Sequence, residues 1–68
     1  METEVQKLLN QVSMQKEFDF IKRLGGKVFI IDNKVIIHAG IIPKTTADIF
    51  ANRIRKLDPQ NILLVNVQ

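Results

Sequence analysis

The chain of 68 residues contains no cysteine, tryptophan or tyrosine, and only one histidine. Without cysteine it can form neither a disulfide nor a thiolate metal site. It also has no run of about 18 apolar residues, the length that a membrane-spanning helix needs, and its first ten residues are acidic where a signal peptide would be basic. We therefore expect a cytoplasmic protein with no metal, no cofactor and no membrane partner.

The sequence also lacks the groups of polar side chains that catalysis requires. His38 is the only imidazole and has no serine, cysteine or second histidine beside it, and the seven acidic residues are scattered singly. No two carboxylates are spaced to act as an acid and a base. We expect a protein that is not an enzyme and has no catalytic residues.

The length predicts a single domain, residues 1–68, close to the lower size limit at which one hydrophobic core stabilises a fold unaided. The net charge of +3 is compatible with a nucleic acid or an acidic protein as partner and requires neither. Because disulfides and metal ions are not expected, oligomerisation is the main remaining source of extra stability.

The densest apolar run, from Lys27 to Ile42, predicts a β-hairpin. It contains two segments of β-branched and aromatic residues, which favour strands, and a polar interruption between them. Asp and Asn in this interruption tolerate the positive φ of a tight turn. Two registers remain open, because the two-residue loop can be Asp32-Asn33 or Asn33-Lys34.

Residues 2–24 have the apolar spacing of a helix, but the stripe of the first half is rotated from the stripe of the second. We therefore expect a bend or a break at residues 10–13, with Ser13 as the cap of a second helical piece. The pair Gly25-Gly26 should end the helix with a left-handed cap.

A second helical segment follows the hairpin. The spacing from Thr45 to Asp48 predicts a capping box at its start. Asp58-Pro59 should end it, because proline has no backbone N–H to donate and disfavours helical geometry in the residue before it. Residues 61–68 are rich in β-branched side chains and predict a third strand.

The predicted order is helix, strand, strand, helix, strand, which defines an α+β fold. The second strand, the second helix and the third strand form a βαβ unit with a right-handed crossover, so the third strand should run parallel to the second. We expect a three-stranded mixed sheet with helices on one face. The sequence leaves open whether the third strand lies beside the first or the second.

Both faces of this sheet are predicted to be apolar. Two helices can cover one alternate set of strand side chains, but the other set is also apolar, where an exposed face would normally be polar. Burying one such side chain contributes about 1.5 to 3 kcal/mol, so something should cover this face: the N-terminal helix, a second copy or another protein. We favour a second copy, as a dimer. The predicted interaction surface consists of Phe29, Ile31, Ile36, His38, Ile62 and Leu64.

The sequence thus predicts a small binding or regulatory protein that acts through a homo-oligomeric interaction surface on its sheet. The alternative is a nucleic-acid-binding protein that contacts phosphates through the second helix. The basic residues concerned are Lys44, Arg53, Arg55 and Lys56. Aromatic stacking partners are scarce, because Phe18, Phe20 and Phe50 are expected in the core.

Overall fold

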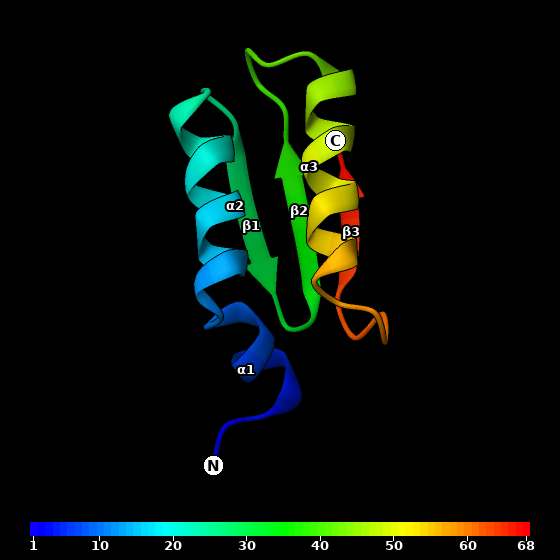
Figure 1. Cartoon of the computed structure of the whole chain (residues 1–68). Helices are drawn as coiled ribbons and strands as arrows, with labels where there is room; N and C mark the ends of the chain where they lie inside the picture. The colour runs from blue at the N-terminus through cyan, green and yellow to red at the C-terminus, as the bar shows by residue number, and fades with distance from the viewer.

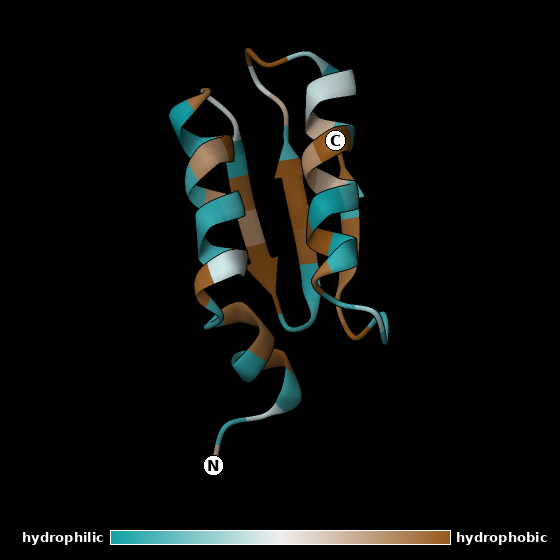
Figure 2. Ribbon diagram, in the orientation of Figure 1, coloured by the Kyte–Doolittle hydropathy of each residue, from teal (hydrophilic) through white to brown (hydrophobic).

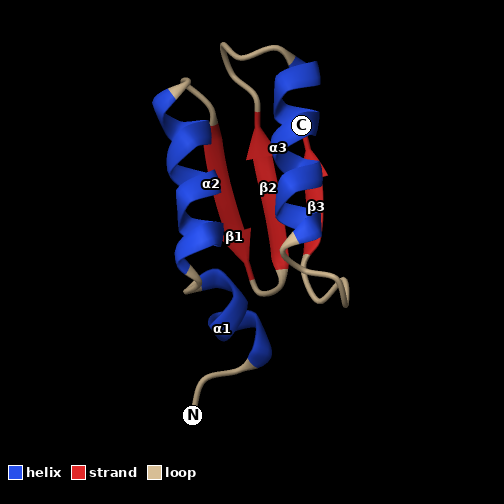
Figure 3. Cartoon of the chain, in the orientation of Figure 1, coloured by secondary structure: helices blue, strands red, loops and turns tan.

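The computed structural model of the chain describes all 68 residues and contains three helices and three strands (Figure 1). In chain order the elements are α1 (Glu4–Leu9), α2 (Val12–Arg23), β1 (Lys27–Ile31), β2 (Lys34–His38), α3 (Lys44–Lys56) and β3 (Leu64–Val67). The strands form one sheet, and α2 and α3 lie side by side against one face of it (Figure 3). The predicted α+β class, with a mixed three-stranded sheet and helices on one face, is confirmed.

Strand β2 is central, with β1 antiparallel on one side and β3 parallel on the other. Phe29 lies opposite Ile36, so the hairpin loop is Asp32-Asn33, the first of the two predicted registers. Asp32 has a positive φ of 54°, which aspartate tolerates better than most residues. In Figure 1 α3 lies in front of the sheet and β3 lies to the right of β2, which is the expected right-handed crossover.

The predicted break in the N-terminal helix is present. Helix α1 ends at Leu9 and α2 begins at Val12, so only Asn10 and Gln11 separate them. The side-chain amide of Gln15 donates a hydrogen bond to the backbone carbonyl of Leu9. This bond satisfies a carbonyl that the break leaves without an intrahelical partner and ties the two helices together at their junction.

The two predicted side-chain caps are wrong. The N-cap positions of α2 and α3 are occupied by Gln11 and Pro43, and neither makes a side-chain capping bond. Ser13 and Thr45 both lie inside the first turn of their helices. Pro43 has a φ of −59°, which suits the start of a helix, so α3 begins directly after it. Only two residues separate α1 from α2, so α2 begins at Val12, one residue before Ser13.

The predicted glycine stop at the end of α2 is confirmed. Gly25 has a φ of +99°, its N–H donates to Lys22 O at 3.1 Å, and the N–H of Gly26 donates to Ile21 O at 2.9 Å. These two bonds form a Schellman motif. A Cβ atom on Gly25 would also collide with the side chain of Ile41, so the turn requires glycine for two reasons.

The hydrophobic core fills the space between the sheet and the helices. Figure 2 shows that all three strands contain apolar residues. Its buried members are Leu8, Leu9, Met14, Phe18, Ile21, Val35, Ile37, Ile42, Ala47, Phe50, Ala51, Ile54, Leu63 and Val65. They come from every helix, from β2 and β3, and from the segments that lead into α3 (Ile42) and β3 (Leu63), while β1 contributes only the partly buried Val28. The first strand is therefore the least covered part of the sheet.

Asp58 organises the loop between α3 and β3. The residue is 2% exposed, and its carboxylate accepts hydrogen bonds from Ile62 N at 2.9 Å and from Leu63 N at 2.8 Å. The side-chain amide of Asn33 donates to Ile62 O at 3.1 Å and so joins this loop to the hairpin turn. Together these bonds set the point at which the chain enters β3.

Candidate interaction surfaces

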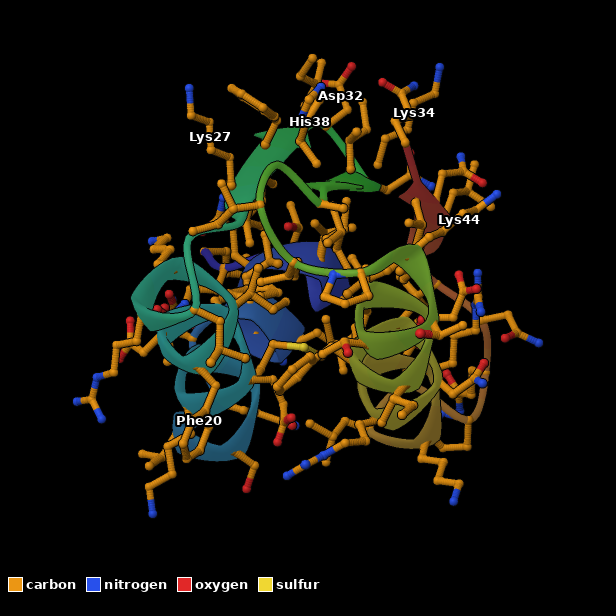
Figure 4. The ribbon with its side chains drawn as sticks, turned by 90° about the horizontal axis from the view of Figure 1, so that it is seen from above. Phe20, Lys27, Asp32, Lys34, His38 and Lys44 are labelled. Carbon is orange, nitrogen blue, oxygen red and sulfur yellow. The ribbon has the colours of Figure 1, made fainter.

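The face of the sheet that points away from α2 and α3 has no helix or loop over it (Figure 4). We call this surface the open face. Cross-strand pairing arranges its side chains in rows: Lys27 with His38; Phe29 with Ile36 and Asn66; Ile31 with Lys34 and Leu64. Four large apolar side chains therefore lie together on the surface of the molecule.

The apolar side chains of the open face are more exposed to water than is favourable for apolar residues. Phe29 is 47% exposed, Ile31 59% and Leu64 49%, and Ile36 at the centre is partly covered by its neighbours. The residues of β2 that alternate with Ile36 point to the helices and are fully buried. Strand β2 thus has one apolar face that is buried and one that remains in contact with water.

Five of the six residues predicted to form the interaction surface share the open face, and the structure places Ile62 elsewhere. Ile62 precedes β3 and is partly buried against the core, beside α1 and the hairpin turn. Its backbone is held there by Asp58 and Asn33. Simple alternation along residues 61–68 cannot predict this, because the strand begins only at Leu64.

Polar and charged side chains surround the apolar part of the open face. Figure 4 shows Lys27, Lys34 and His38 pointing away from the helices, with Asp32 on the same side. Lys27 begins β1, and Asp32 follows directly after its last residue. The opposite charges therefore lie at opposite ends of one strand.

Arg53, one of the predicted phosphate-binding residues, is engaged within the protein. Its Nη2 donates to Glu17 Oε2 at 3.0 Å, and its Nε lies 2.9 Å from Oε1. The Oε1 atom makes no hydrogen bond, because the Nε–H group is not directed at it, so this second contact is a charge contact only. Glu17 is 8% exposed and lies on α2, so the ion pair links the two helices.

The other three predicted phosphate-binding residues do not form one cluster. Arg55 donates to Val65 O at 2.6 Å and to Asn52 Oδ1 at 3.0 Å, so its guanidinium covers the outer edge of β3. Lys44 and Lys56 are the first and last residues of α3. A helix of 13 residues separates them by roughly 18 Å along its axis.

Phe20 was expected in the core, and that prediction is wrong. The side chain is 46% exposed, and Figure 4 shows it on the side of the helices that faces away from the sheet. Helix α2 buries Met14, Phe18 and Ile21, which follow each other at intervals of four and three residues. Phe20 lies outside this stripe, and the spacing alone identifies it once the stripe is assigned.

Phe20 is surrounded by basic side chains and one acidic one. Its ring lies 6.4 Å from that of Phe50, with 28° between the planes, and the guanidinium carbon of Arg23 lies 6.0 Å from its centre. A shallow hollow on α2 is lined by Phe20 and Arg23 together with Lys16 and Asp19. This arrangement combines an aromatic surface with positive charge.

The fold and its surfaces define a two-layer α+β domain that has an open apolar sheet face on one side and helices with basic side chains on the other. No known protein family, curated protein or solved structure matches the chain. None of the three helices has the length and apolar character needed to cross a membrane. No three His, Asp or Glu side chains are grouped so that they could hold a metal ion.

Proposed function

We propose that the chain is a non-enzymatic interaction module that forms homo-oligomers, most simply dimers, through the open face of its sheet. The observation that carries this proposal is the group of apolar side chains on the open face that no element of the fold covers. An antiparallel or mixed sheet with one face in water normally places polar residues there. In a binding or regulatory protein, such a face is available to a partner.

The energetics favour a weak and reversible association. Phe29, Ile31 and Leu64 are each about half exposed, so covering them contributes roughly 1 kcal/mol per side chain, half of the value for full burial. Two copies would gain roughly 5 to 9 kcal/mol from six such side chains, against an association cost of at least about 4 kcal/mol. The balance is at most about 5 kcal/mol, so we expect a dissociation constant of roughly 0.2 mM or weaker.

The distribution of charge supports a second copy as the occupant. If two open faces pack with their strands antiparallel, Lys27 of each copy approaches the end of β1 of the other copy, where Asp32 lies. The two-fold symmetry of a dimer forms this pair twice. A parallel arrangement would instead place Lys34 against Lys34, so charge disfavours it.

Sedimentation equilibrium between roughly 50 µM and 5 mM, a range set by the expected dissociation constant, tests the proposal. Ile31→Lys should shift the protein to monomer while its circular dichroism spectrum stays unchanged, because the substituted side chain is 59% exposed. Ile36→Lys, at the centre of the open face, should have at least as large an effect. A matched control is Ile49→Lys on α3, where the isoleucine is 58% exposed and lies on the other side of the molecule.

A folded wild-type monomer over the whole concentration range would refute self-association. Equal weakening by Ile31→Lys and Ile49→Lys would show that the copies meet through another surface. Loss of the dimer in Ile31→Lys alone, with folding intact, is the expected result.

A further inference from the structure

The positive charge of this protein is concentrated in the two long helices. Helices α2 and α3 together contain seven basic and three acidic residues, a net charge of +4, whereas the whole chain has a net charge of +3. The remaining residues are three basic and four acidic. We call the outer surface of α2 and α3 the helix layer. The two helices are therefore the more positive part of the molecule, which favours contact with a polyanion.

Phe20 is the exposed aromatic side chain of the helix layer. Its ring lies 6.4 Å from that of Phe50, which is 7% exposed, and the guanidinium carbon of Arg23 lies 6.0 Å from its centre. Nearly half of the Phe20 side chain remains exposed. A half-exposed aromatic ring offers a stacking surface for a planar group.

The nearest basic side chains flank Phe20 along α2. Lys16 precedes it by four residues and Arg23 follows it by three, so all three share one face of the helix. Lys16 and Arg23 are separated by roughly 10 Å along the axis, with Phe20 between them. Neither makes a salt bridge within the protein. Asp19 is the one acidic residue in the same hollow.

Across the interhelical boundary, Arg53 extends the positive surface. Its guanidinium carbon lies 5.5 Å from the centre of the Phe50 ring, so Arg–Phe pairs from both helices lie side by side. The pairing with Glu17 uses one edge of this guanidinium, and the Arg53 side chain stays 52% exposed. Its remaining N–H groups are available to a ligand.

We propose that the helix layer binds single-stranded nucleic acid, with one base stacked on Phe20 and the neighbouring phosphates contacted by Lys16 and Arg23. Single strands expose the faces of their bases, whereas in a duplex those faces are stacked on one another. The site differs from the set predicted on α3, because it is centred on α2 and uses an aromatic side chain. It does not depend on self-association through the open face.

The test measures binding of a fluorescein-labelled, mixed-sequence single-stranded oligonucleotide by fluorescence anisotropy at low and higher salt. Phe20→Leu keeps the apolar volume but removes the ring, and it should weaken binding about 5-fold to 100-fold, the effect of one lost base stack. The dependence on salt should stay the same in this variant. Arg23→Ala should instead flatten the slope of log K against log salt by about 0.7, because one phosphate contact is lost.

Lys7→Ala is the matched control for the loss of one charge. Lys7 lies on α1, outside the helix layer, and is 61% exposed in its side chain. It should leave both the affinity and the salt slope close to those of the wild-type protein. The Ile31→Lys variant, on the open face, should bind the oligonucleotide as the wild-type protein does, which separates this site from the proposed dimer surface.

Three results would overturn the proposal. The first is no binding of the oligonucleotide at roughly 50 mM salt, where contacts with phosphates are strong. The second is an affinity for the oligonucleotide that Phe20→Leu does not change, together with an equal affinity for heparin of the same charge. This result would indicate a general polyanion surface. The third is binding to vesicles containing phosphatidylserine but not to the oligonucleotide, which would indicate an anionic lipid surface.

Discussion

Replacing Asp58 with alanine should destabilise the fold more than any other single loss of an acidic side chain. The carboxylate accepts hydrogen bonds from two backbone N–H groups, at 2.9 and 2.8 Å, and the residue is almost fully buried. Asp58→Ala removes both bonds and leaves the N–H groups of Ile62 and Leu63 without a partner. A hydrogen bond to a charged group contributes about 1.5 to 3 kcal/mol, so we expect the loss of two to cost about 3 to 6 kcal/mol.

This loss is large for a chain of this size. At about 0.05 to 0.15 kcal/mol per residue, the total free energy of unfolding lies between roughly 3 and 10 kcal/mol. Asp58→Ala should therefore lower the midpoint of urea unfolding strongly and can leave the protein partly unfolded without denaturant. Far-ultraviolet circular dichroism is the suitable probe, because the chain has neither tryptophan nor tyrosine.

Two further variants make the test specific. Asp48→Ala removes an exposed aspartate from α3 that makes no hydrogen bond or salt bridge within the protein, and it should change stability by no more than about 0.5 kcal/mol. Asp58→Asn keeps one acceptor oxygen but places an N–H₂ group against a backbone N–H, so it should cost nearly as much as Asp58→Ala. Equal stability of the Asp48 and Asp58 alanine variants would refute the role assigned to this carboxylate.

Two other stability predictions follow from single contacts. Arg53→Ala leaves the carboxylate of Glu17 without its partner and should lower the free energy of unfolding by about 1 to 3 kcal/mol. The effect is limited because the arginine is half exposed. Thermal unfolding should show a smaller loss when Glu17→Gln is also present. Gly25→Ala places a Cβ atom at a φ of +99° and against Ile41, and should cost at least about 1 kcal/mol. Urea unfolding should show a smaller cost in an Ile41→Ala background, and an equal cost there would assign the whole effect to the backbone.

The parts of the fold that the sequence predicted are those with strong local signals. Two β-branched segments on either side of Asp32-Asn33 define a hairpin. The pair Gly25-Gly26 suits the end of a helix, because Gly25 adopts a positive φ there. The order of the strands was not predictable, because a right-handed crossover satisfies either position of β3. The structure resolves it through Asn33, whose backbone and side chain both bond to the segment that leads into β3.

The placement of the residues in the candidate surfaces was predicted less well, because it depends on contacts between distant residues. The alternation along β1 and β2 correctly identified an apolar face opposite the helices. The sequence gives no sign that Arg53 lies next to Glu17, 36 residues away, or that Arg55 reaches the carbonyl of Val65. Both arginines appear as an exposed basic patch when the helix is considered alone. Phe20 was wrongly grouped with its neighbour Ile21, which belongs to the buried stripe of α2.

The two proposed surfaces differ in the force that would drive binding, and the fold separates them. On the open face the favourable term is burial of apolar area, which salt affects little, whereas on the helix layer it is the release of counterions, which salt reduces steeply. A sheet and a layer of helices, together more than about 10 Å thick, lie between the two surfaces, and screening at physiological salt acts over about 8 Å. Charge on the helix layer therefore has little effect on contacts at the open face. A dimer formed through the open faces would direct its two helix layers outward in opposite directions, so self-association would double the number of sites for a polyanion without burying either of them.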